Sequence, residues 1–297
     1  MTVLNTAGDG LPNILLVLHQ AALASAKPIA RTALLETVAP DAAIQDSGKM
    51  ARQTLNRWIE LGLFQERDGE VTVSARPPKK LSGMALTAFT RREVCRLSMS
   101  DENTPALWAI EGAKSADLTR SLAWLLAQNV FETRMSELEA LESQQISNED
   151  LRLLRNSTRQ NGLRHWADFL GFSRGLGGDI DPTVAVRDAL PEILGTGEGV
   201  LATDFIDRLS MALPVIDAGR WRRGVLQELN VGALAPLSPG QLSTALSRAL
   251  LGLRAGGELL LQNRADMGSS ITLTGFRGLR PDLNFQWIAR PGKGGQA

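Results

Sequence analysis

Five polar side chains between residues 49 and 57 are of the types that bind nucleic acid: Lys49, Arg52, Gln53, Asn56 and Arg57. Arginine pairs with the edge of guanine, and asparagine or glutamine pairs with the edge of adenine. Lysine and arginine also bind phosphates, which fix the position of a protein on the duplex. We therefore expect this set to contact base edges of double-stranded DNA, with Lys49 on a phosphate.

An amphipathic helix is needed to present these side chains together. Met50, Leu55, Trp58 and Ile59 recur at spacings near 3.6 residues, which places them on one stripe of a helix. The polar residues fall mostly on the other side of that helix. Gly62 follows the last turn, where a glycine can adopt the left-handed conformation that ends a helix.

The elements around this helix predict a winged helix-turn-helix. A first helix is expected over residues 11–24, and a second is expected between Pro28 and Pro40. After the third helix, two strand-like runs flank the turn Arg67-Asp68-Gly69, which is a strong hairpin signal. A hairpin at this place distinguishes a winged domain from the plain motif, and we expect Arg67 at its tip to bind a phosphate.

Residues 75–83 break this pattern with two prolines and three basic side chains, and they mark the first domain boundary. Lys79 and Lys80 in this segment are expected to add phosphate contacts. We predict a mainly α protein with small β-hairpin wings and three domains. They are a winged helix-turn-helix over residues 1–80, an acidic helical domain over 81–199, and a second winged helix with a basic surface and a flexible tail over 200–297.

Charge is distributed unevenly, although the 32 basic and 32 acidic residues cancel. Residues 1–80 carry a net charge of +1, residues 81–217 carry −7, and residues 218–297 carry +6. Two basic ends therefore flank an acidic middle, and the neutral total describes the surface field poorly. The neutral total also argues for modest DNA affinity, because counterion release supplies most sequence-independent affinity.

The acidic middle is expected to be helical. Helices are predicted at residues 87–97, 117–129 and 132–145. Ser147 with Asp150 resembles a capping box, which predicts a further helix that reaches Leu170. The arginines from Arg152 to Arg164 are expected on a solvated face of this helix, with contact to nucleic acid or to an acidic helix as the alternative.

The C-terminal third repeats the order of the N-terminal elements. Helices are predicted at residues 181–194, 203–213, 218–229 and 239–255, the last with Ser238 as its cap. Strand-like runs at 258–262 and 271–274 predict a second hairpin, and residues 285–289 are a candidate extra strand. We therefore expect a second winged helix, in which Arg248 and Arg254 are candidate DNA contacts.

No catalytic arrangement is found in the sequence. The chain has two histidines and one cysteine, Cys95, and it contains no nucleophile-base set, metal-ligand spacing or phosphate loop. We therefore expect a protein that is not an enzyme and that has no cofactor and no metal. No stretch resembles a signal peptide or reaches the length of a membrane span, so a cytoplasmic protein without membrane contact is expected.

Three segments carry a resemblance to a known family: LNTAGDGLPNILLVL, RTALLETVAP and QTLNRWIELGLF. They resemble the DpdG family, which belongs to bacterial gene islands that insert 7-deazaguanine derivatives into DNA and restrict unmodified DNA. The resemblance implies an accessory protein of a DNA-modification and phage-defence system, and it supplies no catalytic residues. Winged-helix regulators are similar over the same segment.

The sequence thus predicts a non-enzymatic winged-helix protein that binds DNA within a defence or modification complex. Protein subunits of that complex are expected as further partners, and a homodimer is one expected arrangement. Two alternatives stay open. One is a structural adaptor whose winged helices bind protein subunits, and the other is a transcriptional repressor, which would require dimers and a palindromic site.

Overall fold

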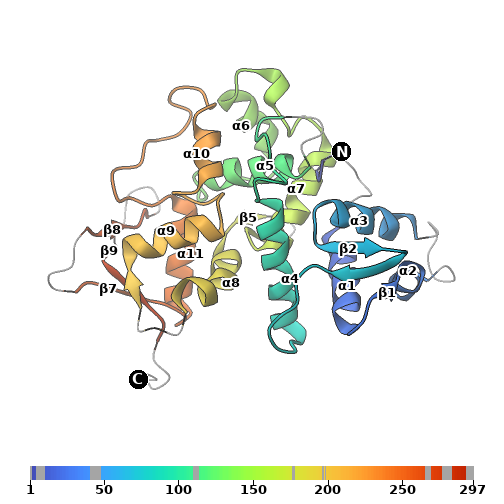
Figure 1. Ribbon diagram of the computed structural model, residues 1–297. Helices are drawn as coiled ribbons and strands as arrows, with labels where there is room; N and C mark the ends of the chain where they lie inside the picture. The colour runs from blue at the N-terminus through green and yellow to red at the C-terminus, as the bar shows by residue number, and fades with distance from the viewer. Residues whose placement is uncertain are drawn as a thin grey trace. The chain divides into compact units, whose positions relative to one another are not determined.

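The computed structural model describes residues 2–4, 11–40, 48–109, 114–175, 178–195, 197, 199–264, 269–275 and 283–291. Within these ranges the protein has eleven α-helices and small antiparallel sheets, so the mainly α fold class is confirmed (Figure 1). The chain divides into two units. The first comprises residues 1–119 and 153–170, and the second comprises residues 120–152 and 171–297.

The N-terminal elements of the first unit follow the order helix, strand, two helices and hairpin. They are α1 (Pro12–Ala24), β1 (Ile29–Ala30), α2 (Arg31–Val38), α3 (Lys49–Glu60), β2 (Phe64–Arg67) and β3 (Glu70–Val73). The strands form one antiparallel sheet in the order β1-β3-β2, in which Val71 lies opposite both Ile29 and Glu66. Asp68 and Gly69 both have positive φ at the β2–β3 turn, and the predicted hairpin is confirmed.

The centre of the predicted apolar face of α3 is buried, and Met50 and Ile59 at its margins are half-buried. Leu55 and Trp58 have no exposed surface, and the ring centroid of Trp58 lies 5.6 Å from that of Trp166 in α7 (Ser157–Leu170). A further helix, α4 (Gly83–Ser98), packs against both α1 and α7. Full burial of a side chain such as Leu55 contributes about 1.5–3 kcal/mol, so this face holds α3 in one orientation.

A histidine belongs to the same core. His19 of α1 has no exposed surface and lies between Phe64 and Phe89, with its Nδ1 3.0 Å from Thr90 Oγ1. Burial lowers the pKa of His19 to about 4, so the ring is neutral near pH 7. His19 therefore packs beneath the hairpin as a neutral aromatic ring.

The helix that was predicted to open at Ser147 begins ten residues later, and that prediction is wrong. Residues near Ser147 form only the short 3-10 helix η1 (Glu149–Leu151). α7 opens instead after Asn156, whose Oδ1 accepts a hydrogen bond from Arg159 N at 2.9 Å. The expected row of arginines from Arg152 onward is therefore not one helical face.

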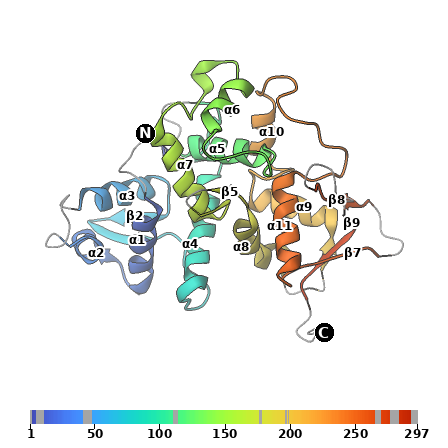
Figure 2. The same cartoon turned by 180° about the vertical axis from the view of Figure 1, so that it is seen from behind.

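The second unit begins within α5 (Ala116–Ala127), and α8 packs against α9 and α11 in it (Figure 2). Its helices are α6 (Leu138–Gln145), α8 (Thr183–Leu194), α9 (Ala202–Ala212), α10 (Arg220–Leu226) and α11 (Thr244–Ala255). Its strands are β4 (Ser173–Arg174), β5 (Asp179–Ile180), β6 (Val200–Leu201), β7 (Leu260–Gln262), β8 (Ile271–Thr272), β9 (Asn284–Phe285) and β10 (Trp287–Ala289). The predicted flexible tail, residues 292–297, lies outside the described residues.

The predicted hairpin between residues 258–262 and 271–274 is wrong. β7 pairs with β10, and β8 pairs with β9. These strands have only two or three residues, so their partners are set by what the core buries, including Ile288 and Phe285. The resulting order β6-β10-β7 nevertheless corresponds to β1-β3-β2. In both sheets, the first strand in the chain comes directly before a helix and pairs with the strand that is last in the chain.

α11 also starts later than predicted, and Ser238 is not its cap. Ser243 caps the helix by accepting a hydrogen bond from Leu246 N at 3.2 Å. The preceding residues run beside β8 instead, where Thr272 N donates to Gly240 O at 2.9 Å. Gly240 has a φ of +76°, a conformation that a helix cannot continue through.

Candidate nucleic-acid interface

One face of α3 is polar and exposed. Lys49, Arg52 and Asn56 are exposed on this face, and Gln53 beside them is half-buried. Residues three and four apart in a helix are neighbours on its surface, so the three exposed side chains form one row. α3 therefore presents two cations, one carboxamide and, at its end, the carboxylate of Glu60 to solvent, while its opposite face is fixed in the core.

Arg57 does not share that face, and its predicted place opposite the apolar stripe is wrong. The Arg57 side chain is 5% exposed, and its Nη1 donates to Glu60 Oε2 at 2.8 Å. It lies one helical turn after Thr54, whose side chain is also buried. A long arginine stem adds apolar contact in such a place, so Arg57 has the position of a packing residue.

Arg31 joins the α3 surface, although no sequence pattern distinguishes it from a solvated arginine. It is the first residue of α2, and its Nη1 lies 2.5 Å from Glu66 Oε2 of β2. Its Nη2 donates to Asn56 Oδ1 of α3. One guanidinium group thus bridges the polar face of α3 and the hairpin, through partners 25 and 35 residues away in the chain.

The hairpin and the segment after it carry the other candidate phosphate contacts of the first unit. Arg67 is exposed beside the turn, opposite Glu70 in the β2–β3 register. Lys79 and Lys80 are exposed in the proline-rich segment. Arg76 anchors that segment by donating to the carbonyl oxygens of Leu23 and Ser25, at 3.1 and 2.6 Å.

In the second unit, the polar face of α11 is occupied by the protein's own chain. Arg248 Nη1 donates to Ile180 O at 3.2 Å, and its Nη2 and Nε lie 3.4 and 3.6 Å from Asp179 and Asp181. Ser247, the residue before Arg248, has a buried hydroxyl that accepts a hydrogen bond from Thr274 N. Of the two candidate contacts on this helix, Arg254 is exposed and Arg248 is committed to the β4–β5 hairpin.

The described ranges contain histidine, cysteine, aspartate and glutamate side chains on several elements. No group of three or more histidine, cysteine, aspartate or glutamate side chains there is arranged to hold a metal ion. Cys95 is buried in α4. Over the same ranges, no helix combines the length and apolar character needed to span a membrane.

Comparison with known proteins places the chain in a family. A family model described as DpdG-like matches residues 1–267, far beyond the N-terminal segments that carry the resemblance in the sequence. No curated protein and no solved structure matches the chain. Because the family model covers most of the 297 residues, the chain belongs to the DpdG-like family, which is associated with DNA-modification systems.

Proposed function

We propose that the protein is a non-enzymatic DNA-binding component of a bacterial DNA-modification and phage-defence system. In this proposal, residues 11–80 form a winged helix-turn-helix that binds double-stranded DNA. The observation that carries the proposal is the exposed row Lys49, Arg52 and Asn56 on a helix whose opposite face is buried. The sheet order β1-β3-β2 directly beside that helix supports it.

Each side chain of this surface has a distinct role in the proposal. α3 enters the major groove, which is wide enough for a helix and displays a different donor and acceptor pattern for each base pair. Arg52, Gln53 and Asn56 contact base edges. Lys49 at the start of α3 and Arg67 at the hairpin turn hold phosphates on either side of the groove.

The segment after the hairpin adds Lys79 and Lys80 as phosphate contacts. With Lys49 and Arg67 this makes about four phosphates, so the logarithm of affinity should fall with the logarithm of salt with a slope of roughly −3.6. That slope is modest, in keeping with the neutral total charge of the chain. Partner subunits or a homodimer would add the affinity that a single module lacks.

A second candidate role concerns the second unit. We infer that α8, α9 and α11 with the sheet β6-β10-β7 form a second winged helix, because its strand order corresponds to that of the first sheet. Its third helix is covered by the β4–β5 hairpin through Arg248, which argues against base contact there. This favours an adaptor role for the second unit, in which it binds protein.

The DNA-binding proposal is tested by fluorescence anisotropy of a labelled duplex at low and physiological salt. The test variant is Arg52→Ala with Asn56→Ala, and the matched control is Arg96→Ala, which removes a cation from the exposed side of α4. We expect salt-sensitive binding by the wild type and the control, and a loss of at least about tenfold in the test variant. Absence of binding by the wild type at low salt would remove the proposal.

A further inference from the structure

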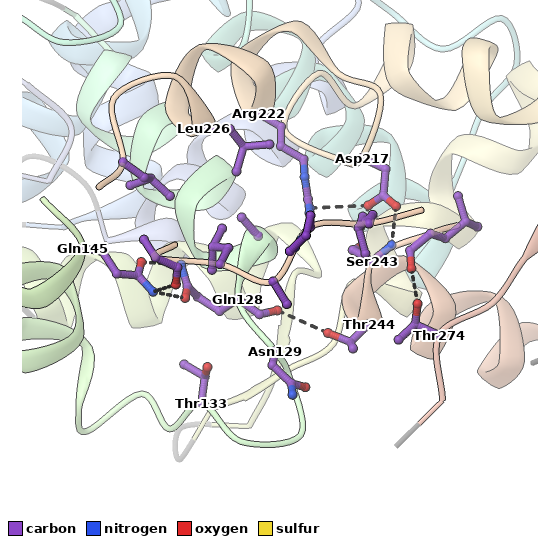
Figure 3. A pocket seen from close by; sticks show the side chains of 18 of the residues that line it. Gln128, Asn129, Thr133, Gln145, Asp217, Arg222, Leu226, Ser243, Thr244 and Thr274 are labelled. Atoms are coloured by element: carbon purple, nitrogen blue, oxygen red, sulfur yellow. Dashed lines mark hydrogen bonds and ion pairs between the residues drawn. The ribbon is translucent and has the colours of Figure 1, made fainter. Parts of the chain in front are cut away.

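A cleft of about 1400 Å³ lies within the second unit (Figure 3). Its walls come from the end of α5 and the loop after it, from α6, and from the long segment between α10 and α11. Clefts that hold small ligands usually measure about 300–1,000 Å³. This cleft therefore has room for a larger guest.

One wall of the cleft is braced by two paired carboxamides. Gln145 Nε2 donates to Gln128 Oε1 at 2.8 Å, and Gln128 Nε2 donates back to Gln145 Oε1 at 3.0 Å. Trp124 Nε1 adds a hydrogen bond to the same Gln145 oxygen at 2.8 Å. Because these three side chains are buried and bonded to one another, α5 and α6 hold a fixed separation and the wall is preformed.

A second wall is the segment of residues 231–238, which is fixed at both ends. Before it, Asn230 N donates to Gln145 O at 2.8 Å. After it, Gln241 Nε2 donates to Thr274 Oγ1 at 2.9 Å. The segment between these anchors has no regular secondary structure, so its side chains and its backbone groups both contribute to the surface.

Apolar side chains are exposed along this second wall and at the end of α10, which precedes it. Leu226, Val231 and Leu237 line the cleft and are 41%, 106% and 43% exposed. Exposed apolar side chains that gather in a hollow mark binding surfaces, because covering them removes apolar area from water. The guest should therefore carry apolar side chains of its own.

The charge of the cleft restricts the guest further. Among the charged residues of the described lining, Asp217 and Arg222 lie 3.4 Å apart and neutralise each other. Glu132 and Glu137 are then in excess, and both are exposed. Two unbalanced carboxylates repel a phosphate backbone and attract a cationic guest.

We propose that this cleft binds an extended segment of a partner protein, one that carries apolar side chains and a net positive charge. The cleft is larger than a small-ligand site, and its exposed apolar side chains favour burial against a partner. Its excess carboxylates favour a partner segment that is positively charged. The proposal does not depend on DNA binding by α3. It gives the second unit a defined partner chemistry.

The test selects displayed random peptides of about 12 residues, which span roughly 40 Å when extended, on the immobilised full-length chain. Recovered peptides are synthesised, and their affinities are measured by fluorescence anisotropy. Val231→Ser with Leu237→Ser, which removes apolar surface without adding charge, should weaken binding by at least about tenfold. The matched control, Met84→Ser, changes an 89% exposed apolar residue of the first unit and should leave affinity unchanged.

A second variant tests the charge. Recovered peptides should be rich in apolar residues and in lysine or arginine, and Glu132→Lys with Glu137→Lys should reverse that preference toward acidic peptides. Three results would overturn the proposal: recovery of no peptide, equal affinity for the wild type and the Val231→Ser, Leu237→Ser variant, or a charge preference that the lysine substitutions leave in place.

Discussion

Arg31 donates a hydrogen bond to Asn56 Oδ1, and this contact decides which hydrogen-bonding groups Asn56 can offer. An asparagine pairs with adenine by accepting through its oxygen and donating through its nitrogen at once. Arg31 engages one of the two lone pairs of Oδ1, which weakens this oxygen as an acceptor, while both Nδ2 hydrogens stay available to donate. Within the DNA-binding proposal, Asn56 should therefore favour guanine, which offers two acceptors in the major groove, over adenine, which offers one acceptor and one donor.

Arg31→Ala should change base preference. Removal of the guanidinium frees Asn56 Oδ1. The preference for adenine at the contacted position should therefore rise by roughly 1–3 kcal/mol. Selection from randomised duplexes measures the preference of each variant. Glu66→Gln is the control, because it breaks the ion pair of Arg31 and keeps its contact with Asn56; an equal shift in both variants would contradict this role of Arg31.

Arg57→Ala should reduce stability and leave DNA affinity unchanged. Its side chain is buried and paired with Glu60, so truncation removes packing and costs about 1–3 kcal/mol. Chemical denaturation gives the free energy of unfolding, and anisotropy at a temperature where the variant is folded gives the affinity. Weaker binding with unchanged stability would return Arg57 to the DNA-contacting face.

His19 should make stability depend on pH. Its pKa is about 4 in the folded protein and near 6.5 in the unfolded chain, so the unfolded chain binds the extra proton between these values. The free energy of unfolding should fall as pH decreases from 6.5 to 4, by about 3 kcal/mol in total, and level off below. Denaturation of the wild type and of His19→Leu across this range isolates the effect, and parallel profiles would contradict it.

Asp217→Ala should strongly destabilise the second unit. The Asp217 carboxylate accepts from Ser243 N and Oγ, both at 2.6 Å, and pairs with Arg222. Burial already lowers the pKa of Arg222, and loss of its partner leaves a buried charge uncompensated, which costs about 3–5 kcal/mol. Thermal unfolding should show that adding Arg222→Met restores part of the loss, and no recovery would assign the cost to the Ser243 contacts alone.

Local signals in the sequence were sufficient for the elements near α3. The stripe from Met50 to Ile59 and the Asp68-Gly69 turn each act within a few residues, and the structure has both the helix and the hairpin. The start of a helix was harder to predict, because two capping signals lie close together in the sequence and only one of them caps the helix. Asn156 caps α7 where Ser147 was predicted to open it, and the adjacent burial of Leu153 and Leu154 breaks helical spacing between them.

Contacts between residues that are distant in the sequence account for the features that local patterns do not predict. Arg31 meets Asn56 and Glu66 only after the helices pack, so its place in the surface has no local pattern. The same holds for Arg248, whose partners lie on the β4–β5 hairpin. The three-stranded sheet β6-β10-β7 is the extreme case, since two- and three-residue strands carry too little pattern to identify their partners.

That sheet also sets an order of folding. β2 and β3 are joined by a two-residue turn and can pair within microseconds, whereas β10 must find β6 across a long intervening chain. Until Trp287 reaches Leu201, the edges of β6 and β7 stay open to pairing with other chains. Refolding at high protein concentration should therefore lose material through the C-terminal sheet, while the N-terminal hairpin forms early in every molecule.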